Sequence, residues 1–420
     1  MKTKVLVLEQ QSWMGGAQRV LEVVLKAVNK DFDPIVMFPK VGPFSARLNE
    51  SGFRTCTFPL GTYRSGRKSY AEGLIFIFRS IVCALKIILF IRKHDVRCIY
   101  INGPRCLPAG VMAGWFTRRP SLFHLHLVLT RRSELLIGAQ FARHVSRIVA
   151  CSQAAAESLL KADPRLASKT LVLYNPALGT RREAPGRACR AEAVTFGMVG
   201  RITETKGHQV VLSALGMLGR DWRRKTRLIV VGAPAPGSPD DLKYLQRLAE
   251  YAAQQGLNDQ IQWAGYQADP DSYYDQMDAL LQPSFGEALG LTILEALQHG
   301  LPVIAFRTGG IPEIIKDGVN GLLVSPDEDA LLAGIRRFLE DEGLRDRLRE
   351  GARAELDSRF SVDTFKISIC HLVRGLSGSG DVITPEAGLH EESRGSDGLP
   401  RYHHRLRADG DIACADSKQC

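Results

Sequence analysis

The 420-residue sequence lacks the patterns of a cysteine-built scaffold. Its nine cysteines are scattered, and no two of them form a Cys-x-x-Cys pair. We therefore expect neither a disulfide framework nor a thiolate metal centre, and this cysteine usage is typical of a reducing compartment. His403 and His404 are adjacent but have no third ligand at a suitable spacing, so they do not predict a metal site.

The sequence also lacks an uncharged apolar run of the ~20 residues that a membrane-spanning helix requires. The N-terminal stretch MKTKVLVLEQ has too short an apolar run for a signal peptide. In the long apolar segment 71–93, charged residues recur every seven positions and would line one stripe of a helix. They are Glu72, Arg79, Lys86 and Lys93. A half-buried helix of an α/β layer is the favoured interpretation, and an amphipathic face that contacts lipid, assisted by RSGRK at 64–68, is the alternative.

Charge is unevenly distributed along the chain. The whole sequence has 55 Lys/Arg against 45 Asp/Glu, whereas residues 1–180 alone have 26 against 10. The basic first part predicts contact with something anionic, such as a phosphate-bearing membrane surface or nucleic acid. Zinc-finger spacing, a homeodomain-like helix set and an aromatic–basic ribonucleoprotein signature are all missing, so we expect no nucleic-acid partner.

Short apolar strands alternate with helical patterns along most of the chain. KVLVLE at 4–9 is typical of a buried parallel strand, and the alternation restarts with AVTFGMVG at 193–200. Such alternation predicts parallel sheets with helices on both faces. A stretch rich in Pro, Gly, Ala and Arg, 175–193, separates the two runs. We therefore expect an α/β protein of two Rossmann-like domains with a cleft between them.

Open parallel sheets bind ligands beyond the carboxyl ends of their strands, and three marked segments should lie there. In the first, Gly15 and Gly16 stand between a strand and a helix, where amides can approach a phosphate, although a simple turn fits as well. In the second, GRITETKG, Arg201 and Lys206 suit a diphosphate, and a solvated loop is the alternative.

The third segment, PSFGEALGLTILEALQHGLPVIAF, contains Glu287 and Glu295. One interpretation is structural: Thr292 and Glu295 form a capping box that starts a helix, which Gly300 and Pro302 then end. In the other interpretation, the carboxylates accept hydrogen bonds from sugar hydroxyls, while amides at the helix N-terminus hold an anion.

The order of these motifs resembles the retaining glycosyltransferases of family 4, which have the GT-B fold. The matching signature residues are Glu287 and Glu295 of an E-x7-E motif, and Gly309, Gly310 and Glu313 of a GG-x-x-E element. In the first half, GGAQRV, FHLHL and ACSQAAAESL are similar to the family's Gly-rich loop, its histidine-ended strand and its last N-domain turn. The likeness extends from about residue 3 to residue 370 and is most specific over 195–335.

The resemblance implies a donor-binding set: Gly16, Arg201, Lys206, Glu287, Leu289, Gly290 and Glu295. Arg201 and Lys206 would hold the donor diphosphate, and Gly16 would approach it from the opposite lobe. The two carboxylates would bind hydroxyl groups, Glu295 on the ribose and Glu287 on the donor sugar. Amides near Leu289 and Gly290 would meet the sugar and the phosphate.

The resemblance also implies a catalytic set: His126, Glu287, Arg201 and Lys206. His126 would lie in the cleft between the lobes, close to the reacting centre. The sequence departs from the family pattern in two places. Leu289 stands where Phe is frequent, and Leu127 follows the histidine where an acidic residue is common. The second departure leaves open whether His124 or His126 is the functional residue.

The resemblance assigns roles to four segments: 1–180 as the N-terminal Rossmann-like acceptor-binding domain, 193–357 as the C-terminal Rossmann-like nucleotide-sugar-binding domain, 358–376 as a helix that packs back toward the first domain, and 377–420 as a tail. The composition of that tail is polar and rich in Gly, Ser and Asp, so we expect it to be disordered.

The implied reaction moves a sugar from a UDP- or GDP-sugar to a glycan or lipid-linked acceptor, with retention of the anomeric configuration. It would serve exopolysaccharide, capsule or lipopolysaccharide assembly, in the cytoplasm or peripherally on the inner face of the cytoplasmic membrane. An Asp-x-Asp pair of the metal-binding type in a suitable place is missing, so we expect no metal or other cofactor.

Two alternatives stay open at this point. The chain could be an inactive nucleotide-sugar-binding or scaffold protein, or an epimerase of the same GT-B fold. The four charged positions Arg201, Lys206, Glu287 and Glu295 favour an active transferase. The sequence leaves the donor sugar, its base, the acceptor, the linkage and the oligomeric state undetermined, and segment 232–270 is the expected site of base selection.

Overall fold

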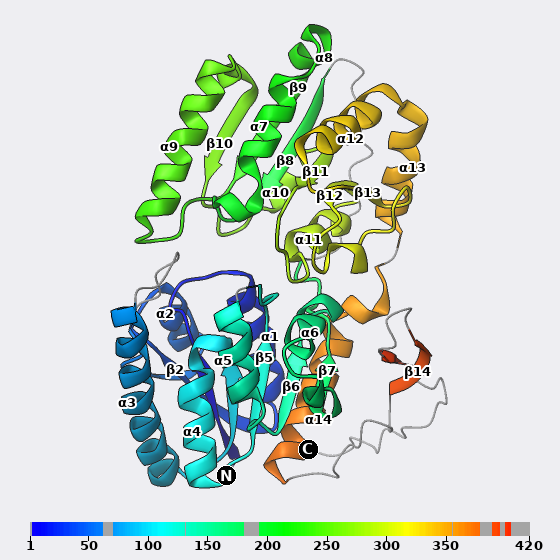
Figure 1. Ribbon diagram of the computed structural model, residues 1–420. Coiled ribbons are helices and arrows are strands. Elements are labelled where there is room, and N and C mark those ends of the chain that lie inside the picture. Colours follow the sequence, from blue (N-terminus) through cyan, green and yellow to red (C-terminus); the bar gives the residue numbers. More distant parts are fainter. Residues whose placement is uncertain are drawn as a thin grey trace, which may run out of the picture.

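The structure is a computed structural model that describes residues 2–61, 70–130, 132–179, 193–354, 356–378, 389–394 and 400–404. The chain forms two α/β lobes, drawn one above the other in Figure 1. The basic segment 64–68 lies outside the described residues.

The lower lobe contains a seven-stranded parallel sheet in the order β3-β2-β1-β4-β5-β6-β7. Its strands are β1 (Thr3–Glu9), β2 (Phe32–Phe38), β3 (Arg54–Thr57), β4 (Val96–Asn102), β5 (Ser121–Leu125), β6 (Arg147–Ala150) and β7 (Thr170–Val172). Its helices are α1 (Gly16–Val28), α2 (Pro43–Glu50), α3 (Tyr70–His94), α4 (Leu107–Thr117), α5 (Arg132–Ala142) and α6 (Gln153–Leu160). Helices cover both faces, which is why β1 is apolar along most of its length: Leu6 and Val7 are buried in hydrophobic clusters on opposite sides of the sheet.

The upper lobe contains a six-stranded parallel sheet in the order β10-β9-β8-β11-β12-β13. Its strands are β8 (Val194–Val199), β9 (Thr226–Val231), β10 (Ile261–Gly265), β11 (Ala279–Gln282), β12 (Val303–Phe306) and β13 (Gly321–Val324). Its helices are α7 (His208–Gly216), α8 (Arg220–Arg224), α9 (Pro239–Gln254), α10 (Asp271–Tyr274), α11 (Leu291–Gln298), α12 (Glu328–Glu340) and α13 (Glu342–Arg353). The two parallel sheets confirm the predicted α/β class of two Rossmann-like domains.

The last long helix, α14 (Val362–Ser377), packs on the lower lobe although it follows the upper lobe in sequence. Phe365, Ile369 and Val373 are buried in the same hydrophobic cluster as α1. Within the segment 377–420, for which we expect disorder, the structure contains an antiparallel strand pair, β14 (Leu389–Arg394) and β15 (Pro400–His404). Apart from this pair and residues 377–378, the segment lies outside the described residues.

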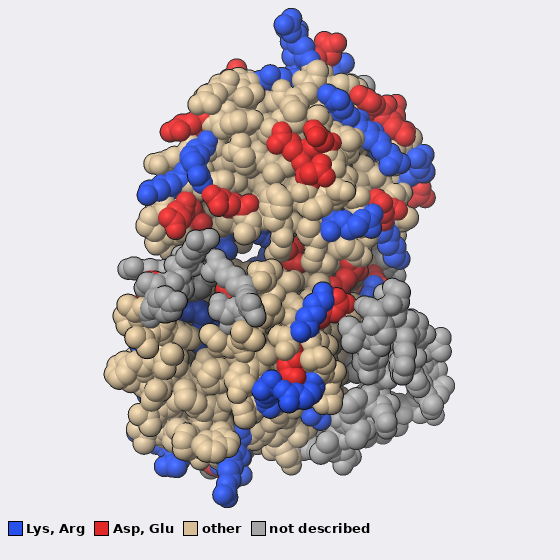
Figure 2. All heavy atoms as spheres, viewed as in Figure 1, with Lys and Arg blue, Asp and Glu red and all other residues tan. Residues whose placement is uncertain are grey.

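The loops that follow the strands of the two sheets meet where the lobes join. The Ser152 hydroxyl, after β6, donates a hydrogen bond of 2.5 Å to the carbonyl of Ala288, after β11. Gln298 of α11 exchanges two hydrogen bonds, of 2.9 and 2.7 Å, with the backbone of Gly179. Figure 2 shows a hollow at this junction. The carboxyl ends of both sheets therefore border one shared site.

Candidate active site

The start of α1, in the lower lobe, lies against the upper lobe. Gly16 begins the helix, and a Cβ at this position would lie 3.1 Å from the Leu291 side chain at the start of α11. The N-termini of the two helices therefore come close together across the junction. Each offers backbone amides and a partial positive charge, the two features that bind an anion.

Glu295 points from α11 into the junction, where Arg19 of α1 forms an ion pair with it. The buried Tyr274 hydroxyl donates a 2.9 Å hydrogen bond to the other carboxylate oxygen. Burial raises the pKa of Glu295, an effect that Arg19 and the tyrosine oppose. The expected capping box is wrong. The N-cap of α11 is Gly290, so Thr292 lies inside the helix, and its hydroxyl donates to Gln282 at 3.3 Å.

Glu287 forms an ion pair with Lys206, and Gln282 donates to the same carboxylate oxygen at 3.3 Å. Lys206 follows β8, and its Cε lies 4.0 Å from the place that a Cβ would occupy on Gly200. Arg201, the next residue after Gly200, is exposed. The segment after β8 thus brings Lys206 to the loop that carries Glu287, whereas Arg201 is exposed after the same strand.

A close fit between two loops fixes the backbone around Glu287. A Cβ on Gly309 would lie 2.0 Å from the Glu287 carbonyl oxygen, and one on Gly310 would lie 2.1 Å from that of Ala288. The Gly310 amide donates to the Glu287 carbonyl at 3.0 Å. Side chains larger than hydrogen would push this loop away, so the glycine pair holds it in place.

The next two residues present backbone rather than side chains to the site. Leu289 is buried in the core, so it could contribute an amide but not its side chain. Gly290 has φ +106°, a conformation that only glycine adopts without strain, and it leads directly into α11.

Glu313 of the GG-x-x-E element joins the lobes. Its carboxylate accepts hydrogen bonds from the amides of Gln153 and Ala154, at 2.8 and 2.9 Å, in the first turn of α6. A carboxylate on a helix N-terminus is a favourable arrangement. This motif residue thus bridges the upper and lower lobes, a role that the sequence did not indicate.

The two histidines, His124 on β5 and His126 just after it, differ in burial and in hydrogen-bond partners. His124 is fully buried, and its Nδ1 pairs with the hydroxyl of the equally buried Tyr100. His126 is half-buried, and its Nε2 lies 2.9 Å from Asn102 Oδ1. Burial lowers the pKa of His126 to about 3 and that of His124 well below its usual value, so both rings are neutral near pH 7. Of the two rings, that of His126 is the less buried.

A hydrogen-bond chain fixes the tautomer of His126. Asn102 donates its amide to Glu9 at 2.5 Å, so its oxygen is an acceptor and Nε2 of His126 must donate. Nδ1 of His126 is then an acceptor, and this buried atom has no hydrogen-bond partner among the described residues. The ring therefore offers one free lone pair.

Glu9 at the end of β1 is a site residue that sequence reasoning missed. It is completely buried and accepts from the Gln18 side chain at 2.9 Å and the Gln11 amide at 2.8 Å, besides Asn102. Burial raises the pKa of its carboxyl to about 7. An acidic residue that ends an otherwise apolar strand was the available signal.

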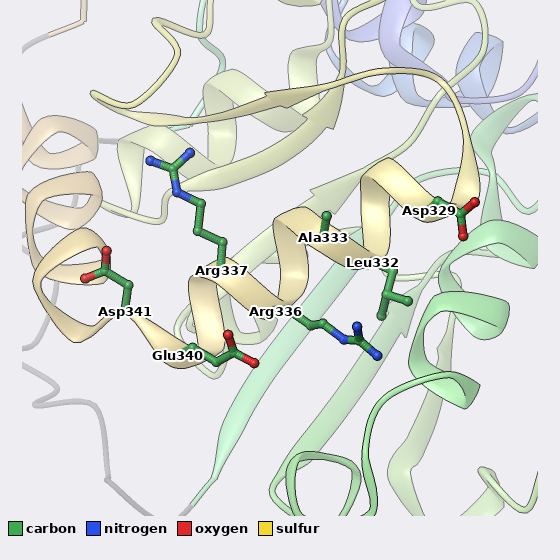
Figure 3. Close-up of a pocket in the computed structure, with 7 residues that line it drawn as sticks. All are labelled: Asp329, Leu332, Ala333, Arg336, Arg337, Glu340 and Asp341. Carbon is green, nitrogen blue, oxygen red and sulfur yellow. The ribbon is translucent and has the colours of Figure 1, made fainter.

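The part of the chain that the structure describes contains no group of three His, Cys, Asp or Glu residues able to hold a metal ion. A hollow on the outside of the upper lobe, drawn in Figure 3, is lined only by α12 and the residue after it, among them Arg336, Arg337 and Glu340. None of the sequence-predicted site residues lines it.

Two family models match the chain. The model described as Glycosyltransferase Family 4 matches residues 14–177, and the one described as Glycosyl transferases group 1 matches residues 186–355. The chain belongs to the family 4 glycosyltransferases. The resemblance stated from the motifs is thereby confirmed.

Known relatives share part of the sequence and nearly all of the fold. D-inositol 3-phosphate glycosyltransferase of Streptomyces bingchenggensis is 31% identical over 248 residues, which span 55% of this chain and 52% of that protein. The chain thus spans about half the length of such curated relatives.

Solved structures match over a longer range. Anabaena HepE in complex with UDP and glucose has a TM-score of 0.74 at 24% identity, covering 88% of this chain and 99% of HepE. WaaG, a glycosyltransferase involved in lipopolysaccharide biosynthesis, has a TM-score of 0.62 at 16% identity, covering 87% of this chain and 99% of WaaG. These likenesses show that the family 4 chain has the GT-B fold.

Proposed function

We propose that this protein is a retaining glycosyltransferase that moves a sugar from a nucleotide-diphosphate sugar to a glycan or lipid-linked acceptor. The observation that carries the proposal is the pairing at the lobe junction, where Lys206 meets Glu287 and Arg19 meets Glu295. Cations suited to a diphosphate and carboxylates suited to hydroxyl groups thus stand together beside two helix N-termini.

The donor would replace parts of these ion pairs. The ribose hydroxyls would donate to Glu295 and those of the sugar to Glu287, since a carboxylate oxygen can accept more than one hydrogen bond. Lys206 would lose part of its contact with Glu287 and would bind the diphosphate together with Arg201. HepE, a neighbour in fold, has been solved in complex with UDP and glucose, which makes a UDP-sugar the first donor to test.

Breaking the bond between the anomeric carbon and the diphosphate places negative charge on the leaving group. Arg201, Lys206 and the amides at Leu289 and Gly290 would stabilise that charge, which is electrostatic preorganisation. The acceptor hydroxyl attacks the anomeric carbon on the same face from which the leaving group departs. The leaving phosphate takes the proton of that hydroxyl. The configuration is thereby retained. His126 Nδ1, an unprotonated acceptor, would hold a hydroxyl of the donor sugar.

The proposed setting is surface-polysaccharide assembly, with the acceptor reached at the inner face of the cytoplasmic membrane. We propose that transfer needs no metal, because the cations and backbone amides of the site would stabilise the charge that a metal ion stabilises in other transferases. Closure of the lobes would exclude water and favour transfer over hydrolysis.

Thermal shift with a panel of UDP-, GDP- and ADP-sugars tests donor binding, since a bound donor raises the melting temperature by mass action. Transfer of the stabilising sugar is then followed with candidate acceptors, and the anomeric configuration of the product is read by NMR. A product of inverted configuration overturns the retaining assignment. Conversion of the donor to an epimeric sugar without acceptor identifies an epimerase, and binding without any turnover identifies a scaffold.

A further inference from the structure

Most of the large hydrophobic side chains that the described residues expose lie on three neighbouring helices of the lower lobe. On α3 they include Leu74, Phe78, Leu85 and Leu89, and Trp115 and Leu136 continue the set on α4 and α5. Phe78 is 67% exposed and Trp115 is 69% exposed. A soluble monomer rarely leaves so many large apolar side chains in one place, and such a patch marks an interaction surface.

The pattern of α3 explains how this surface arises. Cys83, Ile87 and Ile91 face inward and belong to the core of the lobe. Phe78 and Leu85 lie on another side of the helix and are exposed, together with residues three or four positions away on the same stripe. From Leu74 to Leu89 this stripe is about 22 Å long at ~1.5 Å per residue. The helix therefore has a second apolar face that the lobe does not use.

By length and composition alone, Ala71–His94 could cross a membrane, and one third of its most apolar 18-residue stretch is buried. Its place in the fold argues for another arrangement. β4, in the middle of the seven-stranded sheet, begins two residues after α3 ends, and the inner face of the helix is part of the core. The helix is held against the sheet, so only its outer face is available to lipid.

Basic residues stand at one end of the apolar surface. A hollow between the ends of α3 and α4 is lined by Arg92, Arg118 and Arg119, with Phe116 and the single acidic residue Asp95. Asp95 pairs with Arg119 at 3.2 Å, and Nε of that arginine is buried without a partner among the described residues. Arg92 and Arg118 are exposed. The hollow thus has an excess of positive charge suited to a phosphate group.

The sequence around this hollow is also positively charged. Residues 70–142 contain ten Lys/Arg against three Asp/Glu. In Figure 2 the lower lobe shows little charge over α3 and α4, and Lys/Arg side chains gather at its lower edge. An apolar surface bordered by cations complements an anionic bilayer, whose headgroups lie above its acyl chains. A protein partner would need no such excess of positive charge.

We infer that the outer face of α3, α4 and α5, with the arginine hollow at its end, docks on a bilayer that contains anionic phospholipid. The apolar side chains enter the interfacial region, where Trp115 suits the headgroup level, and Arg92 and Arg118 contact lipid phosphates. This inference rests on the proposed function in one respect: a lipid-linked acceptor would give the surface its purpose.

Flotation of the purified full-length chain tests this surface. Vesicles of phosphatidylcholine alone are compared with vesicles that contain about a third phosphatidylglycerol, at low salt and in ~0.5 M NaCl. We expect the protein to float with the anionic vesicles at low salt, and at least tenfold less with neutral vesicles or at high salt. Protein that stays unbound with anionic vesicles at low salt overturns the inference.

Two double variants with matched controls locate the contact. F78E/L85E should abolish flotation, whereas Leu242→Glu, an exposed helix position of the upper lobe, should leave it unchanged. R92A/R118A should weaken binding about 30-fold, at ~5-fold per cation. R336A/R337A, which removes two exposed arginines from the hollow of Figure 3, is its control.

Nucleotide-sugar thermal shifts, measured on every variant, report folding and donor binding separately from lipid binding. F78E/L85E that shifts like the wild type but does not float supports the inference. F78E/L85E that floats like the wild type overturns it. The inference is also overturned if light scattering shows that the wild type is a dimer, that F78E/L85E is a monomer, and that neither floats. The surface is then an interface between two copies. If the donor panel fails while flotation holds, the proposed function fails and the membrane surface stands.

Discussion

The two lobes contribute opposite kinds of chemistry to the site between them. The upper lobe brings exposed or half-buried charges on loops after its strands, and Lys206 and Glu287 already pair there. The lower lobe brings a buried network in which Glu9, Asn102 and His126 are joined by hydrogen bonds and the histidine is neutral. The charges of the upper lobe suit a diphosphate. A buried hydrogen-bond network suits the positioning of hydroxyl groups.

Two sets of contacts connect the lobes. Arg19 and Glu295 connect the two halves of the site itself, whereas Glu313 and the start of α6 connect them outside it. A donor would compete for the first connection and leave the second intact. We therefore expect the lobes to separate around the Glu313 contact rather than to come apart completely.

The largest effect should come from the charged half. Lys206→Ala and Glu295→Ala should each lower transfer by ~10²-fold or more, because each removes a contact to the donor in the transition state. Steady-state kinetics with the donor found by thermal shift measures this, and Lys243→Ala, an exposed lysine on α9, is the matched control. Turnover within about threefold of wild type for both variants would refute the assignment.

In the lower-lobe half of the site, substitutions of the two histidines should have different effects. His126→Ala should reduce turnover by ~10- to 100-fold, because its Nδ1 is lost. It should also lower the free energy of unfolding by roughly 1–3 kcal/mol, because the buried Asn102 Oδ1 loses its donor. His124→Ala should lower the free energy of unfolding by roughly 2–4 kcal/mol, since it leaves a cavity beside Tyr100. Kinetics and urea denaturation of both variants measure this. A well-folded His124→Ala with the larger loss of turnover would reverse the assignment.

A smaller effect is expected at the contact that orients Glu295. Tyr274→Phe removes the hydrogen bond to this carboxylate and should raise the KM for the donor about tenfold, with a smaller change in kcat. Tyr251→Phe, which removes a 3.1 Å hydrogen bond to Ser213 away from the site, is the control. Equal kinetics for the two variants would show that the orientation of Glu295 does not depend on Tyr274.

The smallest effect on turnover is expected for Glu9, whose influence should appear in the pH dependence of stability. Its pKa is about 7 in the folded chain and 4.5 as the reference value, so the folded state favours the protonated carboxyl. Its stabilising contribution is present below about pH 4.5 and is lost as the pH rises through 7, by up to roughly 3 kcal/mol. Urea denaturation from pH 5 to 8 should therefore show the wild type losing stability relative to Glu9→Gln. Parallel pH profiles would contradict this.

The sequence by itself determined the class of fold and the charged half of the site. Apolar strands and helical patterns alternate because both faces of each sheet are covered, and that is a local property of the chain. Lys206 and Glu287, which the structure pairs, could be predicted because loops after strands keep a recognisable order.

Only the tertiary structure decided which groups meet. Arg19 and Glu295 are far apart in sequence, so no local pattern joins them. The capping box expected at Thr292 does not form because α11 begins at Leu291 with Gly290 as its N-cap, which places Thr292 inside the helix. The choice of His126 over His124 and the raised pKa of Glu9 depend on burial and on partners from other strands. Hydrogen bonds and desolvation act between residues that folding brings together, and a linear pattern does not contain them.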